Sequence, residues 1–227
     1  MCAKTDSVPP EKQYRFERID HPDSIASHGI RILGCLEPGD TIDLPDQIDG
    51  LPVLAIADKA FFGTGIKSIT LPASLVSIGA RAFQNCQKLE AIRLPDSIRK
   101  IEAYTFDGCS RLRDVSLPLN LEEIASHAFS GCRQLIRVII PSHVTIIRAD
   151  AFLDCRNLQE VVLPDGLREI GTVDRTRPVA RYGGAFENCV NLASIAIPES
   201  VVVMGQKSFK GCVRLKRIEI PRHIMRI

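Results

Sequence analysis

The sequence predicts an elongated α/β solenoid, dominated by β-strands, in which a unit of 23 residues is stacked on itself. Three observations predict it: an apolar phrase that recurs, a column of prolines and a column of phenylalanines, each at a fixed place in the phrase. Such units cannot bury their apolar faces alone and do so by stacking on their neighbours. The copies begin at Ile66, Leu89, Leu112, Leu135, Leu158, Leu192 and Leu215, with spacings of 23 residues except for one of 34.

Each copy is expected to begin with a short strand that ends at a proline. In the copy from Leu89 this strand is 92–94, in which alternate residues are apolar, and Pro95 follows it. Proline has no amide hydrogen and therefore ends a ladder of backbone hydrogen bonds. A second extended piece, 98–101 in this copy, comes after the turn. The same column holds Pro45, Pro72, Pro118, Pro141, Pro164, Pro198 and Pro221.

The rest of each copy carries a phenylalanine and, three residues later, a cysteine. This spacing places two side chains on one face of a helical turn, so we expect one short helical turn per repeat, at 103–107 in the copy from Leu89. Asn, Asp or Gly precedes each cysteine and tolerates a left-handed backbone, so the chain should turn there. The phenylalanines, expected to stack as a spine, are Phe61, Phe83, Phe106, Phe129, Phe152, Phe186 and Phe209. The cysteines are Cys86, Cys109, Cys132, Cys155, Cys189 and Cys212.

The full phrase, L-x-x-I-x-L-P-x-x-I-x-x-I-x-x-x-A-F-x-x-C, resembles the BspA-like class of leucine-rich repeats from about Gly39 to the C-terminus. Thr105 and Ser208 replace the alanine before phenylalanine, and Gly63-Thr64-Gly65 stands where the first copy would carry cysteine. The resemblance implies a horseshoe-like leucine-rich-repeat solenoid that serves as a surface-exposed or secreted module for binding and adhesion. It implies no particular ligand.

The extent of the repeat divides the chain into three segments. Residues 1–12 are polar, contain two prolines and are expected to be disordered. Residues 13–38 match no repeat; their two expected strands, 14–16 and 30–32, should pair as an N-terminal cap over the first copy. The solenoid is expected over 39–227, and its first copy is lengthened by a turn near Asp49-Gly50.

Composition excludes several classes of function. The formal net charge of +2 creates no field that would attract nucleic acid or an anionic membrane. Because six of the eight cysteines share one column with parallel side chains, we expect buried, reduced thiols rather than disulfides. There is no C-x-x-C motif, phosphate-binding loop or nucleophile elbow, and His127 and Asp150, in adjacent copies, suggest only a surface ion pair. We therefore expect no catalytic residue, no cofactor and no metal.

The location of the protein is left open by the sequence. The chain shows no signal peptide and no apolar segment long enough to span or insert into a membrane, which by itself suggests the cytoplasm. The resemblance implies the cell surface or secretion instead, so either the protein is cytoplasmic or the chain is a piece of a longer one. The last copy stops at Ile227, before its phenylalanine and cysteine, and leaves the final repeat uncapped.

Outward strand positions are polar in the early copies but apolar at Ile139, Val162 and Ala196. A contiguous outward apolar strip indicates a partner surface. Strand propensity, or a neighbouring element that covers these residues, would also explain it. The strip, or the uncapped last repeat, could also mediate self-association.

The copy of 34 residues contains an insertion at about 172–182 that should leave the solenoid as a loop. Arginine and tyrosine are frequent at binding hot spots, so a recognition loop is one interpretation. A tolerated surface insertion is the other, because lengthening a loop costs little. The candidate contact residues of the loop are Arg175, Arg177, Arg181 and Tyr182.

The sequence therefore predicts a non-catalytic repeat module that presents a rigid face to a protein partner of unknown identity. The contacts expected are the strip and the loop. The alternative is a structural or adhesive segment of a larger cell-surface protein.

Overall fold

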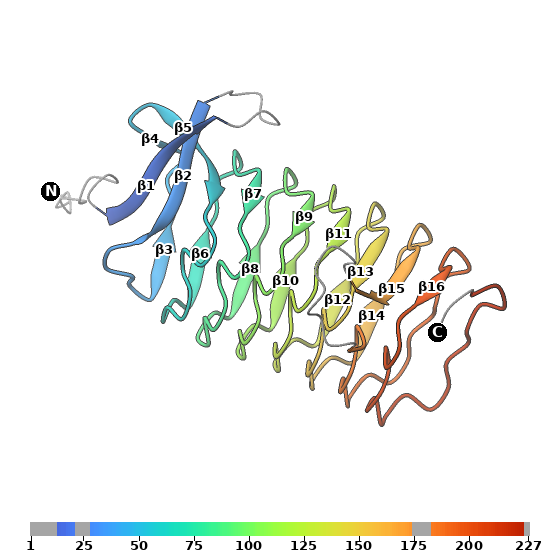
Figure 1. Ribbon diagram of the computed structural model, residues 1–227. Helices are drawn as coiled ribbons and strands as arrows, with labels where there is room; N and C mark the ends of the chain where they lie inside the picture. The colour runs from blue at the N-terminus through green and yellow to red at the C-terminus, as the bar shows by residue number, and fades with distance from the viewer. Residues whose placement is uncertain (1–12, 21–27, 174–182, 225–227) are drawn as a thin grey trace, which may run out of the picture.

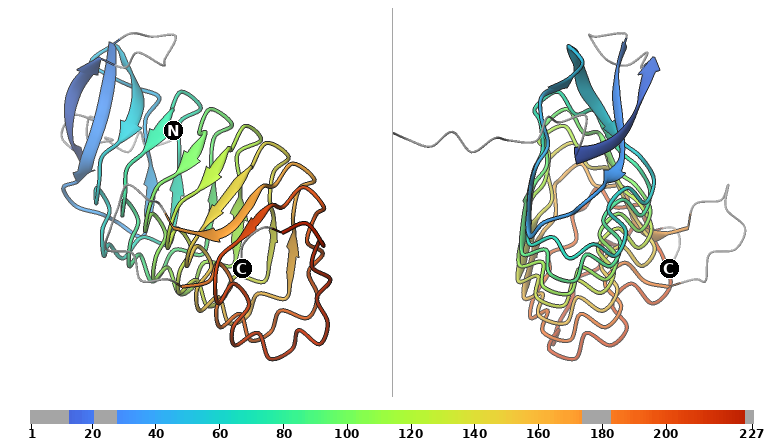
Figure 2. Two further views of the ribbon diagram at one scale, coloured as in Figure 1. Left: turned by 45° about the vertical axis from the view of Figure 1, so that its right-hand side comes forward. Right: turned by 90° about the vertical axis from the view of Figure 1, so that its left-hand side faces the viewer.

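Alternate apolar residues in the short strands turn inward, and the coils that they line stack into an elongated solenoid (Figure 1). The computed structural model describes residues 13–20, 28–173 and 183–224, and all statements on structure concern these residues. Residues 1–12, expected to be disordered, lie outside them. Viewed along the stack, the coils of successive copies nearly superimpose (Figure 2).

The first strand of each copy lies on one face of the stack. These strands pair in parallel doublets, β3 with β6, β8 with β10 and β12 with β14. Only the central residue of each strand points inward, for example Ile92 in β8 and Val138 in β12. The bounds are β3 Thr41–Asp43, β6 Ser68–Thr70, β8 Ala91–Arg93, β10 Asp114–Ser116, β12 Arg137–Ile139 and β14 Glu160–Val162.

The second extended pieces form a separate, continuous parallel sheet in the order β9-β11-β13-β15-β16. Here amides donate to the preceding copy, as Ala125 does to the carbonyl of Ile101 at 3.0 Å. The ion pair between Arg99 and Glu122, 2.6 Å long, links neighbouring copies on the outside of this face. The bounds are β9 Lys100–Ile101, β11 Glu123–Ile124, β13 Ile146–Arg148, β15 Glu169–Thr172 and β16 Val203–Met204.

The expected cap hairpin is present. β1, Tyr14–Asp20, pairs antiparallel with β2, His28–Cys35, and lies across the N-terminal end of the stack (Figures 1 and 2). The other edge of β2 pairs in parallel with β5, Leu51–Ile56. β5 also pairs with β4, Gln47–Ile48, and with β7, Ser77–Ile78. The turn expected at Asp49-Gly50 joins β4 to β5, and both residues have positive φ, 51° and 74°, as a tight hairpin turn requires.

The prediction of one helical turn per repeat is wrong, because no element in the described part of the chain is a helix. The fold is therefore a β-solenoid rather than an α/β solenoid. In the segment expected to be helical, the amides of Tyr104, Phe106 and Gly108 donate to carbonyls of the next copy, at 3.1, 2.8 and 2.8 Å. The alternate amides donate to carbonyls three residues back in their own copy. A helix would direct every amide along its own axis and would leave nothing to join the copies at this edge.

The left-handed turns expected before the cysteines are confirmed. Their φ angles lie between 56° and 77° at Asn85, Gly108, Gly131, Asp154, Asn188 and Gly211. A second left-handed column, two residues before the phenylalanines, was not expected. It is present before six of the seven phenylalanines and absent before Phe186, where Gly184 stands. It holds unrelated residue types and so has no signature in the sequence: Lys59, Arg81, Tyr104, His127, Asp150 and Lys207, with φ between 58° and 62°.

The phenylalanine spine is confirmed. The rings of the seven residues stack in order, with centroids 5.3–5.6 Å apart and planes within 12° of parallel. This distance follows from the spacing of the strands that carry the rings, about 4.8 Å. Each central ring therefore stacks on one ring of the preceding copy and on one ring of the following copy.

The cysteine column is a ladder of free, buried thiols, as expected. Each thiol donates to the carbonyl of the phenylalanine in the preceding copy; Cys132 reaches Phe106 at 3.3 Å, and Cys155 reaches Phe129 at 3.1 Å. The carbonyl oxygen of Phe106 also accepts a hydrogen bond from the amide of Cys109, at 3.1 Å. The thiol of Cys132 therefore donates to the second lone pair of this oxygen. Thr64 takes the cysteine position in the first copy and donates to Phe61 in its own copy, at 2.9 Å.

We expect Phe129→Ala to lower the free energy of unfolding by about 3–5 kcal/mol, because the cavity would separate two stacked rings. Leu119→Ala is the matched control, since Leu119 is 66% exposed and should cost little. Urea unfolding followed by circular dichroism measures both. Equal midpoints for the two variants would contradict the role of the spine.

We also expect the ladder thiols to be unreactive in the folded protein. Burial raises the pKa of Cys109, Cys132 and Cys155, and it raises the pKa of Cys212 to about 11, so little thiolate is present at neutral pH. In a Cys2→Ser chain, an aromatic disulfide reagent should modify the half-buried Cys35 alone until denaturant is added. Rapid reaction of every thiol without denaturant would show that the ladder is open.

Candidate partner-binding surface

Two of the three predicted strip residues lie side by side on the first face of the solenoid. Ile139 of β12 is the register partner of Val162 of β14. Their inward neighbours, Val138 and Val161, fill the core, so the alternation of the strand turns the two predicted residues outward. Ile139 is 54% exposed and Val162 is 40% exposed.

Ala196 extends the strip by one copy. It is exposed, and its segment is joined to β14 by a single bridge, between Glu160 and Ser194. In the earlier doublets the corresponding outward positions are polar; Thr70, for example, donates to Asp43 at 2.7 Å. The apolar character is therefore restricted to the copies that begin at Leu135, Leu158 and Leu192, since the last copy again carries polar residues, Arg217 and Glu219, at these positions.

Ile136 adds to the strip and was missed from the sequence. It is 49% exposed and immediately precedes β12. The equivalent positions in the neighbouring copies hold the polar residues Arg113 and Gln159. An apolar residue in a polar column was therefore the signal in the sequence that could have identified Ile136. We refer to Ile136, Ile139, Val162 and Ala196 together as the apolar strip.

A polar rim borders the strip. The guanidinium of Arg137 lies 2.9 Å from the carboxylate of Glu160, across the same pair of strands that carries Ile139 and Val162. Both side chains are half exposed, so the pair contributes little to stability. An apolar centre with a charged margin is the usual anatomy of a protein interface.

The loop candidates Arg175, Arg177, Arg181 and Tyr182 lie outside the described residues. The described stem of the insertion begins in β15. Arg148 of the neighbouring β13 lies 3.4 Å from Glu169 and 3.2 Å from the hydroxyl of Thr172 in β15, and 3.1 Å from Glu123 in β11. β15 belongs to the second sheet, whereas the apolar strip belongs to the first. The stem and the strip therefore start from different sheets.

His127 and Asp150 form more than the expected surface ion pair, and that expectation is wrong. Nε2 of His127 lies 3.4 Å from Oδ2 of Asp150, whose side chain is only 6% exposed. The His127 ring stacks on Tyr104, with centroids 4.5 Å apart, and Arg81 lies over the other face of Tyr104. A Cβ on Gly183, at the end of the insertion, would collide with the Asp150 carboxylate, so the returning chain covers this group.

Both members of this pair are shifted toward their neutral forms. Burial raises the pKa of Asp150 to about 6; Glu187 raises it further and Lys207 opposes the shift. Burial lowers the pKa of His127, although Asp107 opposes it. Loss of hydration therefore outweighs the attraction between the two side chains.

The described residues include no group of three or more His, Cys, Asp or Glu side chains placed to hold a metal ion. None of the elements within those residues is a helix long and apolar enough to cross a membrane.

Comparison with known proteins gives consistent results. The model of the BspA type leucine-rich repeat region matches six copies, over residues 54–173 and 182–227. No curated protein matches the chain.

Several solved structures are similar. A leucine-rich repeat protein from T. pallidum is 35% identical and has a TM-score of 0.75; the match covers 92% of this chain and 90% of that one. A leucine-rich repeat protein from Bacteroides ovatus is 29% identical over 93% of this chain, with a TM-score of 0.79. This chain spans 53% of the Bacteroides ovatus protein. One from Eubacterium ventriosum, 22% identical with a TM-score of 0.67 over 88% of this chain and 50% of that one, shows the fold alone.

We expect Asp150→Asn to gain stability over the wild type as pH rises from about 4 to about 6. Below pH 3.8 the carboxyl is neutral in the folded and unfolded chain, so the two proteins should differ little. Above pH 6 the folded wild type must keep a buried charge, at a cost of roughly 3 kcal/mol at most. Asparagine tolerates the left-handed backbone at this position.

Urea midpoints measured across this pH range provide the test. Asp154→Asn is the control, because Asp154 also has positive φ, 56°, but a more exposed side chain. A difference between Asp150→Asn and wild type that does not change with pH would contradict the buried charge.

Proposed function

The chain belongs to the BspA-type leucine-rich repeat family, and on this premise we propose that it is a non-catalytic module that binds a protein partner through the apolar strip. The observation that carries the proposal is the pair Ile139 and Val162, two large apolar side chains that are adjacent and exposed on one face. Exposed apolar patches with a polar rim are typical of interaction sites on soluble proteins.

Energetics favour this face over the others. Removing apolar surface from water contributes about 25 cal/mol per Å², and the strip concentrates that surface in three neighbouring copies. The strands beneath it are held by backbone ladders and by a buried spine, so binding should cost little ordering of the protein. A rigid apolar centre of this kind supports specific recognition rather than transient contact.

The loop is proposed as a second contact. Arg175, Arg177, Arg181 and Tyr182 are residue types that dominate binding energy where they become buried. Arg148 pairs with Glu123 and Glu169 and donates to the hydroxyl of Thr172, so the described start of the insertion is anchored to the second sheet. Because the stem and the strip start from different sheets, the loop need not contact the same part of the partner.

A second candidate function is a structural or adhesive segment of a larger cell-surface protein. It is favoured by the length comparison, since this chain spans 53% of the similar Bacteroides ovatus protein. In that case the repeats would act as a spacer that extends another part of the longer protein, and the protein would act at the cell surface or after secretion. The partner would then be contacted through other parts of the longer protein.

We expect Val162→Glu to abolish capture of a specific partner by the immobilised protein, because a carboxylate at the centre of the strip would have to be desolvated without a counter-charge. Ser116→Glu is the matched control, since Ser116 holds the same outward position in β10. Partners captured from cells that produce the protein would be identified by mass spectrometry. Arg177→Ala, measured in parallel, tests the loop separately.

A specific partner should bind the wild type and Ser116→Glu but not Val162→Glu, with unchanged urea midpoints for all three. An identical set of captured proteins for all three would overturn the assignment of the strip. Light scattering after size exclusion, over a range of concentrations, shows whether a second copy occupies the strip. A dimer that dissociates in Val162→Glu would identify self-association.

A further inference from the structure

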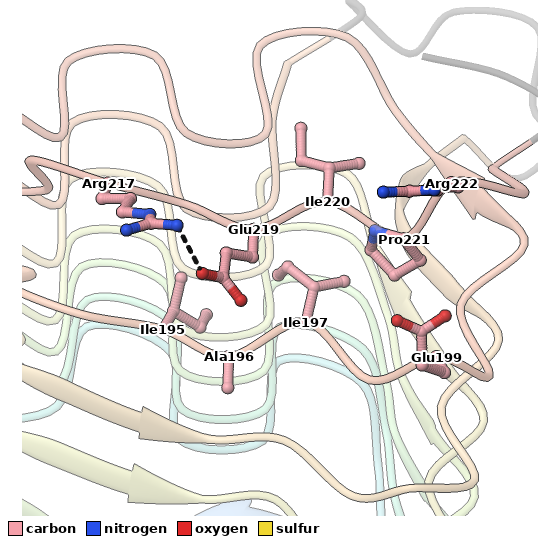
Figure 3. Close-up of a pocket in the computed structure, with 9 residues that line it drawn as sticks. All are labelled: Ile195, Ala196, Ile197, Glu199, Arg217, Glu219, Ile220, Pro221 and Arg222. Carbon is pink, nitrogen blue, oxygen red and sulfur yellow. Dashed lines mark ion pairs between the residues drawn. The ribbon is translucent and has the colours of Figure 1, made fainter.

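A pocket of about 700 Å³ opens between the last two copies, at the segments that correspond to the first strands of the earlier copies (Figure 3). Ile195, Ala196 and Ile197 line one side, and Arg217, Glu219 and Ile220 line the other. This volume lies within the range of binding pockets for small molecules and short peptides. Ala196 also belongs to the apolar strip, so the strip leads directly into the pocket.

The pocket lies where the pairing of the first face is interrupted. Along this face the strands pair in doublets, β3 with β6, β8 with β10 and β12 with β14. The next doublet should join 194–196 to 217–219, one repeat apart. Among the described residues, no backbone hydrogen bond connects these two segments. Both therefore present backbone donors and acceptors toward the space between them.

The walls of the pocket combine these backbone groups with apolar side chains. Ile195 and Ile197 are nearly buried, whereas Ile220 on the facing segment is 42% exposed. Unpaired backbone next to alternating apolar side chains is the chemistry that recognises an extended peptide, through main-chain hydrogen bonds and contacts with every second side chain.

The surroundings carry an excess of positive charge. The four charged residues that line the pocket, Glu199, Arg217, Glu219 and Arg222, sum to zero, and the positive excess comes from Arg214 and Lys216 just before the lining segment. Arg217 pairs with Glu219 at 2.9 Å, and Glu199 pairs with His223 at 3.6 Å. Arg222, at the pocket margin, has no ion pair with another described residue (Figure 3). A negatively charged occupant fits this margin.

We propose that the pocket binds an extended, acidic peptide segment of the partner protein, which adds as a strand between 194–197 and 217–220. The segment would supply the backbone bonds that the open doublet lacks, direct apolar side chains toward Ile197 and Ile220, and place carboxylates near Arg222. The inference rests on the proposed function, because it assigns the pocket to the same partner that covers the apolar strip.

The probe for the test is a short fluorescein-labelled peptide in which valine and aspartate alternate, and the control peptide replaces aspartate with lysine. In fluorescence anisotropy titrations with the whole chain, the acidic peptide should bind saturably, and added salt should weaken it. The basic peptide should bind at least about tenfold more weakly. Equal affinities for the two peptides, or no saturable binding of the acidic one, would overturn the proposal.

Variants of the chain locate the binding site. Ile220→Asp should weaken the acidic peptide at least about tenfold, because it removes an apolar wall and adds repulsion. Ile220→Val should stay within about twofold of wild type. Because Ile220 is partly exposed, both variants should keep the wild-type urea midpoint. Wild-type affinity in Ile220→Asp would place the peptide elsewhere and refute the proposal.

Val162→Glu separates this inference from the proposed function. It should lose the partner but bind the peptide within about twofold of wild type. Partner capture that requires Val162, without any peptide binding, would leave the strip intact as an interface and reject the pocket. A dimer that Ile220→Asp dissociates, without peptide binding, would assign the pocket to a second copy and also reject the proposal.

Discussion

Every feature of this solenoid depends on backbone hydrogen bonds that pass from one copy to the next. On the second sheet the amides donate backward, as from Ala125 to Ile101; on the phenylalanine edge they donate forward, as from Phe106 to Ala128. Each coil is therefore held by both neighbours. The bonds require a spacing close to that of β-strands, and equivalent side chains must then stack directly on one another. Only residue types that pack well against themselves can occupy the inner columns.

This constraint explains both phenylalanine and cysteine. Flat rings can follow one another at 5.3–5.6 Å without a gap. A thiol is small enough for the corner and still reaches the carbonyl of the preceding phenylalanine, which already accepts an amide. Alanine would leave that second lone pair without a donor. The inner columns are thus determined by stacking, and the outward columns are left to vary without disturbing the coil.

Because the outward positions can vary without disturbing the packing, differences between copies that could support binding lie on the surface. The residues of the apolar strip, Ile136, Ile139, Val162 and Ala196, stand at outward positions, and the parallel register of β12 and β14 is kept beneath them. The same reasoning applies to the 34-residue copy, because Phe152 and Phe186, on either side of its insertion in the sequence, remain stacked at 5.3 Å. A partner would therefore contact outward side chains that differ from copy to copy, whereas the backbone and the inner residues that hold them repeat in every copy.

The sequence alone determined the repeat, the spine, the thiol ladder, the left-handed corners before cysteine and the outward position of Ile139 and Val162, because each is a column of one residue type or follows from strand alternation. It misled on the helical turn, since a spacing of three is shared by a helix and by two successive turns, and only hydrogen bonds between copies distinguish them. The burial of Asp150, the contribution of Ile136 and the open doublet beside Ile220 depend on how neighbouring copies cover one another. Such coverage is a property of the stack, and no single copy encodes it.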